Sequence, residues 1–144
     1  MAWDFHHLIK KTIKASLPLF LGLLLIFHPF GQSLAAAKPF MSGDFAKDTV
    51  SVAQSLKETI ALSDDDGQLS ESKDEALALI TAYISRYRNR PQVNGTSSFT
   101  TMQTALNAMA GHYKTFSNRP LPENLKERLN KELTRAEKVV AKEI

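Results

Sequence analysis

The segment from Phe99 to Tyr113 constrains the fold most, because it carries no Asp, Glu, Lys or Arg over fifteen residues. Its apolar residues recur at helical spacing, at Phe99, Met102, Leu106, Met109 and Tyr113. A helix with one face in water normally carries charge on that face. The segment therefore predicts either a central helix covered on most sides by its own domain, or a helix whose polar face docks onto another protein.

The opposite face of this predicted helix is polar but uncharged, with Thr100, Gln103, Asn107 and Gly111 at the same spacing. Charge is depleted both in domain interiors and at the centres of protein interfaces. Both interpretations therefore stay open, with Gln103 and Asn107 as the candidate contact residues. Gly111 costs a helix about 1 kcal/mol relative to alanine, and we expect it to permit the close approach of another backbone.

The composition fits one globular domain, with 144 residues, 43% of them hydrophobic and 23% charged. The net charge of +3 comes partly from the N-terminus, because residues 38–144 hold 15 basic and 14 acidic residues. This balance gives little support to nucleic-acid binding. The chain contains no cysteine, which excludes thiol catalysis, disulfides, thiolate metal sites and a lipid-modified cysteine for this sequence.

The first 37 residues have the pattern of an export signal. Lys10, Lys11 and Lys14 precede an apolar run over residues 17–27, and small residues follow at 35–37. The run is shorter than the roughly 20 residues needed to span a membrane. We therefore expect a signal peptide over residues 1–37, cleaved after Ala37, and a mature domain over 38–144. Retention of the uncut signal as a membrane anchor is the alternative.

Three more segments have helical spacing. The first follows Asp44 or Ser42, either of which can cap a helix, and its apolar face carries Phe45, Thr49, Val52, Leu56 and Ile60. The second is expected to begin at Ser72, which has capping-box spacing to Glu75, and to end before Pro91. The last starts with the run Pro120-Leu121-Pro122, in which Pro122 is acceptable in a first helical turn, and has a narrow apolar seam at Leu125, Leu129, Leu133, Ala136 and Val140. With no strand alternation, the chain predicts an all-α, up-down-up-down four-helix bundle.

Three arginines, Arg86, Arg88 and Arg90, close the second segment. Cations in the last turn of a helix complement the negative end of its dipole. Arginine is also the basic residue favoured at interfaces, so a patch for an acidic protein surface is the second interpretation. We take these arginines, with Gln103, Asn107 and Arg119, as the candidate partner-binding residues.

Catalytic and cofactor motifs are missing from the sequence. Residues 38–144 hold one histidine, His112, which cannot build a polyhistidine metal site. No nucleophile elbow and no phosphate-binding glycine loop appears. We therefore expect no catalytic residue, no metal and no cofactor, and a hydrolase that uses His112 is the least favoured alternative.

Five stretches of the chain carry a resemblance: Asp48-Thr49 with Val52-Ala53, residues 83–88 (YISRYR), 98–108 (SFTTMQTALNA), 111–113 (GHY) and 118–122 (NRPLP). These stretches resemble the Psb-twenty-seven family of small lumenal photosystem II assembly and repair proteins. They occur in order across residues 44–140, essentially the whole predicted mature domain.

The resemblance implies a four-helix bundle in the thylakoid lumen without catalytic residues or cofactor. It implies transient binding, as a monomer, to immature photosystem II at the lumenal loop of the smaller inner-antenna chlorophyll protein. This binding precedes assembly of the manganese cluster and attachment of the extrinsic subunits. Cyanobacterial members commonly carry a lipid-bearing cysteine, which this sequence lacks, so we expect association with the membrane through the complex.

Two other functions remain open at this point. The first is a stable lumenal extrinsic subunit of photosystem II, which would be present in active complexes. The second is an exported helical binding protein that serves another complex. The resemblance favours the assembly and repair role over both.

Overall fold

The computed structural model describes residues 41–143. The predicted signal over residues 1–37 and the predicted cut after Ala37 lie outside the described residues. The helices are α1 (Phe45–Ala61), α2 (Leu69–Tyr87), α3 (Ser97–Thr115) and α4 (Glu123–Val140). No strand occurs within residues 41–143, so the prediction of an all-α fold is confirmed.

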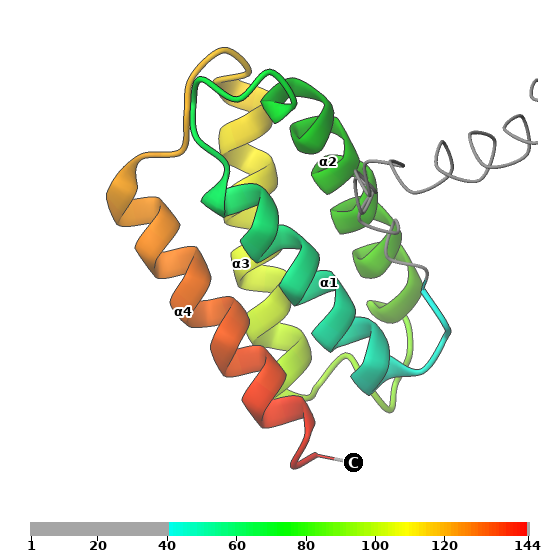
Figure 1. Cartoon of the computed structure of the whole chain (residues 1–144). Coiled ribbons are helices and arrows are strands. Elements are labelled where there is room, and N and C mark those ends of the chain that lie inside the picture. Colours follow the sequence, from blue (N-terminus) through cyan, green and yellow to red (C-terminus); the bar gives the residue numbers. More distant parts are fainter. Residues whose placement is uncertain (1–40, 144) are drawn as a thin grey trace, which may run out of the picture. The chain divides into compact units, whose positions relative to one another are not determined.

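The four helices form a ring in which each packs against its neighbours along the chain. α4 closes the ring because it packs against α1 as well as α3. Figure 1 shows the α1–α2 and α3–α4 connections at one end of the bundle. The α2–α3 connection and the C-terminal residues lie at the other end. This is the up-down-up-down arrangement that short connections favour.

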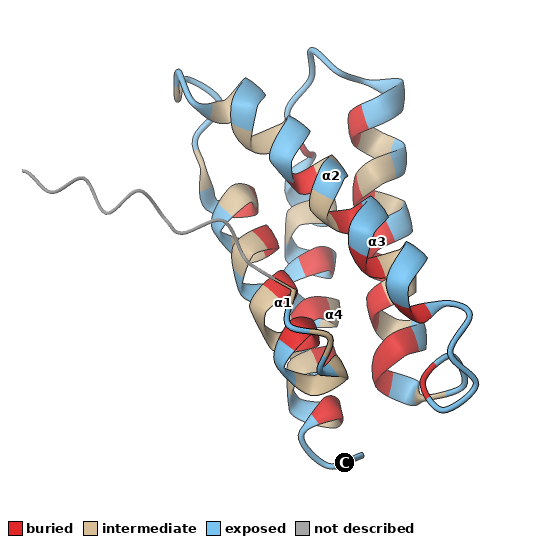
Figure 2. Ribbon diagram, turned by 90° about the vertical axis from the view of Figure 1, so that its right-hand side faces the viewer, coloured by how far each residue is buried: buried red, intermediate tan, exposed pale blue. Residues whose placement is uncertain are grey.

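The core is built from the apolar face of every helix, and Figure 2 shows the buried segments turned toward one another inside the bundle. Fully buried side chains include Val52 and Leu56 from α1, Tyr83 and Tyr87 from α2, Met102 and Leu106 from α3, and Leu129 and Leu133 from α4. This single cluster lies within residues 41–143. The bundle therefore contains a complete core of its own.

Two helix starts differ from the sequence-based prediction. α2 begins at Leu69 and not at Ser72, because the Asp66 side chain accepts the Gln68 amide at 2.9 Å and its carbonyl accepts the Leu69 amide at 3.0 Å. With these bonds in place, Gln68 is the N-cap residue and the first turn of α2 begins at Leu69. From the sequence, Ser97 or Ser98 is the expected cap of the uncharged helix, but α3 is capped by Thr96, since Oγ1 of Thr96 accepts the Phe99 amide at 3.2 Å.

The cap of α1 is Asp44, one of the two predicted residues, because its side chain accepts the Lys47 amide at 3.1 Å. The expected close approach at Gly111 is wrong. A Cβ atom placed there would meet nothing within 4 Å, and the residue is exposed. No helix among the described residues has both the length and the apolar character required to cross a membrane.

Candidate partner-binding surface

The arginine end of the bundle, defined by Arg86, Arg88 and Arg90, is exposed at the C-terminus of α2. The helix ends at Tyr87, so only Arg86 lies in its last turn and the other two arginines follow it. The last-turn position predicted for all three therefore holds for Arg86, whereas Arg88 is the C-cap residue and Arg90 lies two residues beyond it. An exposed trio of one charge is available at this end.

The three arginines differ in how they are held. The guanidinium of Arg90 lies 4.8 Å from the centre of the Tyr87 ring, and its Nη1 donates to the Gly43 carbonyl at 3.3 Å. Nη1 of Arg86 lies 3.2 Å from where a Cβ atom on Gly43 would stand. Arg88 has no side-chain contact of this kind within residues 41–143. It is the arginine whose charge is most available to a partner.

A buried carboxylate, Asp48, positions this end, although sequence reasoning assigned it no role. Asp48 is 1% exposed. It accepts hydrogen bonds from the Ser42 amide (2.6 Å), the Ser42 hydroxyl (2.8 Å), the Gly43 amide (3.0 Å) and the Tyr87 hydroxyl (2.5 Å). These bonds tie the segment before α1 to the end of α2. The available signal was an acidic residue beside Thr49 within the apolar face of the first segment.

The protonation of this cluster follows from its contacts. Burial raises the pKa of the Asp48 carboxyl, but the hydrogen bonds from Tyr87, Ser42 and Gly43 outweigh it, so the net pKa is lowered. Burial also raises the pKa of the Tyr87 hydroxyl, and the hydrogen bond to the charged Asp48 adds to that effect. Asp48 therefore stays ionised and Tyr87 stays protonated at neutral pH.

Aromatic contacts join the arginine end to α3. The Phe45 and Tyr87 rings meet edge to face with their centres 5.2 Å apart. Tyr83 lies 5.1 Å from Tyr87 and 6.2 Å from Phe99, centre to centre. The Tyr83 hydroxyl also lies 2.7 Å from Oγ1 of Thr49. This continuous buried packing fixes the end of α2 relative to the start of α3.

The polar side of α3 is exposed and uncharged. The exposed positions form a line that we call the α3 stripe, made of Thr100, Thr104, Asn107 and Gly111. Asn107 lies on it, as expected, whereas Gln103 is half-buried at its margin. Part of this helix surface therefore faces water without charge, so its own domain does not cover α3 on this side.

Arg119, the sixth candidate, lies away from the arginine end. The Lys73 ammonium, near the start of α2, approaches the Arg119 carbonyl at 3.4 Å. Arg90 follows the end of the same helix and is about 25 Å away at 1.5 Å per residue. The structure thus brings the arginine end and the start of α3 together but separates Arg119 from them.

An exposed aromatic residue beside Arg119 was missed in the sequence. Phe116 is 43% exposed, and the Arg119 guanidinium lies 5.5 Å from its ring centre. The apolar spacing of α3 continues from Tyr113 to Phe116, which suggests burial. However, the helix ends at Thr115, so Phe116 leaves the core.

His112 makes a local contact in the same region. Its Nε2 lies 3.0 Å from the Pro120 carbonyl oxygen, which can only accept, so Nε2 carries the proton and donates. The imidazole ring lies 5.3 Å from the Phe116 ring, centre to centre. These contacts hold the α3–α4 connection against α3. Within residues 41–143, no group of three or more His, Cys, Asp or Glu side chains has the arrangement of a metal site.

Comparison with known proteins matches nearly the whole chain. A family model described as "Photosystem II Pbs27" matches residues 8–140. The "Photosystem II lipoprotein Psb27" of Synechocystis sp. is 40% identical over 128 residues, which are 89% of this chain and 95% of that protein. The "Photosystem II assembly factor lipoprotein Psb27" of Thermosynechococcus vestitus is 38% identical over 125 residues, covering 87% of this chain and 90% of that one.

A solved structure shares the fold. The solution structure of Psb27 from cyanobacterial photosystem II is 42% identical and superposes with a TM-score of 0.69. The match covers 74% of this chain and 92% of that chain. The four-helix arrangement described above is therefore the fold of that relative as well.

Proposed function

Because this chain belongs to the photosystem II Pbs27 family, we propose that it acts in photosystem II assembly and repair and binds its partner through the arginine end and the α3 stripe. In this proposal it docks transiently on the lumenal side of immature complexes. It occupies a surface there and later leaves.

The observation that carries this choice of surface is an exposed arginine trio beside an exposed stripe without charge. Arginine is enriched at interface centres and other charged residues are depleted there. A small polar interface suits a transient contact, because charge complementarity sets the rate and the register of association more than the affinity. Arg88 is the residue expected to contribute most.

The proposed partner is the lumenal loop of the smaller inner-antenna chlorophyll protein, before the manganese cluster is assembled and the extrinsic subunits attach. The family resemblance motivates this choice. An acidic segment of such a loop would complement Arg86, Arg88 and Arg90, while Asn107 and Gln103 would offer hydrogen bonds to its backbone. The protein would act as a monomer, without cofactor and without catalysis.

Membrane attachment is proposed to differ from that of the two lipoprotein relatives. This sequence has no cysteine to carry a lipid. We propose that residues 1–37 direct export and are removed, and that residues 38–144 remain on the lumenal side of the thylakoid membrane. The complex, and not an acyl chain, would then retain the protein there.

A pull-down tests the proposal. The tagged 38–144 domain is incubated with detergent-solubilised thylakoids from its host, and the captured complexes are assayed for subunits and oxygen evolution. We expect inactive complexes that lack the extrinsic subunits. Arg88→Glu should reduce capture about tenfold, since it reverses a charge at the contact, corresponding to about 1.4 kcal/mol.

Arg119→Glu is the matched control, because it makes the same charge reversal at the opposite end of the bundle. If Arg119→Glu abolishes capture while Arg88→Glu leaves capture unchanged, the contact lies at the α3–α4 connection and not at the arginine end. Capture of active complexes would instead indicate a stable extrinsic subunit. Capture of no photosystem II would reject the assembly role for this chain.

A further inference from the structure

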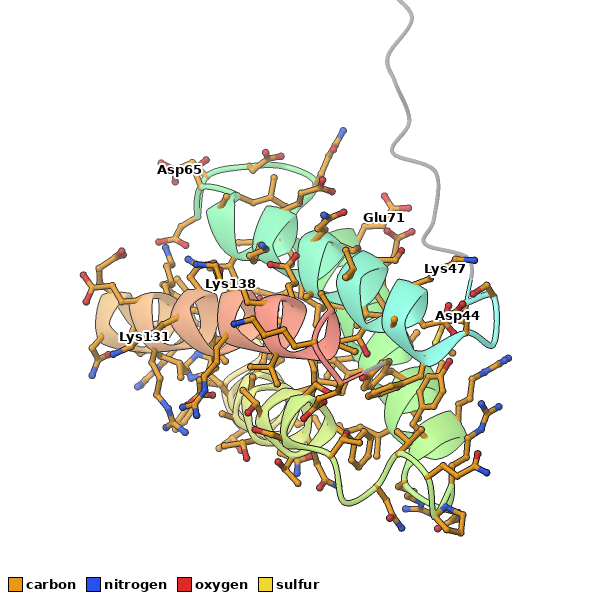
Figure 3. All side chains as sticks on the ribbon, turned by 90° about the horizontal axis from the view of Figure 1, so that it is seen from below. Asp44, Lys47, Asp65, Glu71, Lys131 and Lys138 are labelled. Carbon is orange, nitrogen blue, oxygen red and sulfur yellow. The ribbon has the colours of Figure 1, made fainter. Side chains whose placement is uncertain are left out.

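The outward side of α4 carries positive charge along its C-terminal half. Lys131, Arg135, Lys138 and Lys142 follow one another at spacings of four, three and four residues, and all four are exposed. This spacing places them on one line of the helix surface. We call this line the basic ridge, and it spans about 16 Å at 1.5 Å per residue. Figure 3 labels Lys131 and Lys138 along α4.

The basic ridge is not neutralised within the bundle. Within residues 41–143, the side chains of Lys131, Arg135, Lys138 and Lys142 have no hydrogen bond and no ion pair. The nearby acidic residues of α4 point elsewhere: Glu137 pairs with Lys57 of α1 at 2.6 Å, and Glu132 pairs with Arg128 at 2.9 Å. The four positive charges therefore face solvent unpaired.

The neighbouring helix adds no acidic charge either. α3 contains no Asp or Glu from Ser97 to Thr115. Glu143, just beyond α4, is held by the Ser97 and Ser98 amides at 2.9 and 3.2 Å. Acidic residues gather on the other side of the bundle, where Figure 3 labels Asp65 in the α1–α2 connection and Glu71 in α2. The α3–α4 side is thus positive or neutral from Arg128 onward.

We propose that the basic ridge docks on an anionic lipid surface. Three of its four residues are lysines, which are depleted at protein interfaces, whereas the arginine end has the composition of a protein contact. The side chains that dominate protein contacts are enriched in Trp, Tyr and Arg, and the basic ridge offers only Arg135 of these. Within the described residues the one exposed large apolar side chain is Phe116, which lies in the α3–α4 connection and not on the ridge.

The shape of α4 suits a flat, charged surface. Lys131, Arg135 and Lys138 line an open, shallow depression together with Asn130, Thr134 and Val139. Their long apolar stems can rest along this surface while the charged ends reach lipid phosphates. Because the described part of the ridge has no large exposed apolar side chain to insert into the lipid, binding is electrostatic, weak and reversible. Such contact would hold the protein close to the membrane without occupying the arginine end.

Vesicle binding tests this inference. The 38–144 domain, checked for helicity and cooperative melting, is sedimented with vesicles of 40% phosphatidylglycerol in phosphatidylcholine and with vesicles of phosphatidylcholine alone. Binding to the anionic vesicles is expected, with little to the neutral ones. Each lysine near an anionic membrane surface raises the binding affinity about fivefold. The double variant Lys131→Gln with Lys138→Gln should therefore weaken vesicle binding about 25-fold. Raising the salt to 0.5 M should abolish it.

The matched control is Lys47→Gln with Lys114→Gln, which removes the same charge from exposed positions off the ridge. The affinity of this control variant for the anionic vesicles should stay within about twofold of that of the unsubstituted domain. A change of that size is the general effect of the lower net charge. Equal loss in both double variants would overturn the inference, as would equal binding to neutral vesicles. Unaltered vesicle binding by the ridge variant, together with loss of capture in the photosystem II pull-down, would assign the ridge to a protein partner instead.

Discussion

The hydroxyl of Tyr87 on α2 donates a 2.5 Å hydrogen bond to Oδ2 of Asp48 on α1, at the end of the bundle where the arginines lie. The same carboxylate holds Ser42 and Gly43, whose carbonyl in turn accepts from Arg90. A single buried charge therefore organises the surface proposed for partner binding. Damage to Asp48 should affect both the stability and the shape of that surface.

Tyr87→Phe should lower the free energy of unfolding by about 1.5–3 kcal/mol, because it removes a hydrogen bond to a buried charged group. Urea denaturation followed by circular dichroism measures this change. Tyr113→Phe is the control, since Tyr113 is also buried but its hydroxyl has no hydrogen-bond partner within residues 41–143. Its effect should stay below about 0.5 kcal/mol. Equal losses in the two variants would contradict the role assigned to Asp48.

Acid should destabilise the bundle partly through Asp48. Its pKa is lowered in the folded state relative to an unfolded value of about 3.9. The ionised Asp48 carboxylate therefore contributes its full share of the free energy of unfolding at pH values above the unfolded-state pKa. This share is lost as the pH falls through the pKa of the folded state. Asp48→Asn should reduce stability at pH 7 and make the urea midpoint less dependent on pH below about 5. An unchanged pH dependence in this variant would assign acid unfolding to other carboxylates.

Two glycines should respond to alanine with opposite signs. Gly111 lies exposed inside α3 with open space around its Cβ position, so Gly111→Ala should stabilise the protein by about 0.5–1 kcal/mol. Gly43 has a φ angle of +90° and faces Nη1 of Arg86. Gly43→Ala should therefore destabilise by about 1–2 kcal/mol.

Thermal and urea unfolding of both alanine variants check this pair. Stabilisation by Gly43→Ala would show that the backbone can abandon its left-handed conformation without cost. The pull-down adds a second measurement, because Gly111 lies on the α3 stripe. If the Gly111→Ala variant is more stable but captures less photosystem II, Gly111 lies at the contact with the partner.

Glu143 should stabilise the start of α3. Its carboxylate accepts from the Ser97 and Ser98 amides and from the Ser98 hydroxyl. Glu143→Gln removes the negative charge from a helix N-terminus, which should cost about 0.5–1 kcal/mol, and hydrogen exchange at the Ser97 and Ser98 amides should become faster. Glu127→Gln, at an exposed position of α4, should change neither quantity. Unaltered exchange in Glu143→Gln would show that the contact does not protect these amides.

Helix spacing predicted the four helices well, and the boundaries that failed depended on single side chains. The apolar residues from Phe99 to Tyr113 are buried as their spacing indicated. The start of α2 was placed too late because the Asp66 side chain begins the turn before the capping-box pattern at Ser72. Phe116 continues the apolar spacing but lies beyond the last helical residue.

The proposed binding surface was predictable only in part. The exposed arginines at the end of α2 and the exposed Asn107 follow from patterns within one segment. The half-burial of Gln103 and the distance of Arg119 from the arginine end depend on how neighbouring helices pack. Asp48 gave one signal, an acidic residue within an apolar face, but its partners could not be identified from that pattern.

The sequence by itself determined the helix positions, the uncharged side of α3 and the family resemblance, because these are patterns between residues close together along one chain segment. Only the tertiary structure decided which polar groups meet and which remain free. Asp48 and Tyr87 are 39 residues apart, and Lys57 and Glu137 are 80 apart. Such pairs form when packing of the apolar faces fixes the rotation of each helix, and the same packing leaves the arginine end and the basic ridge facing solvent.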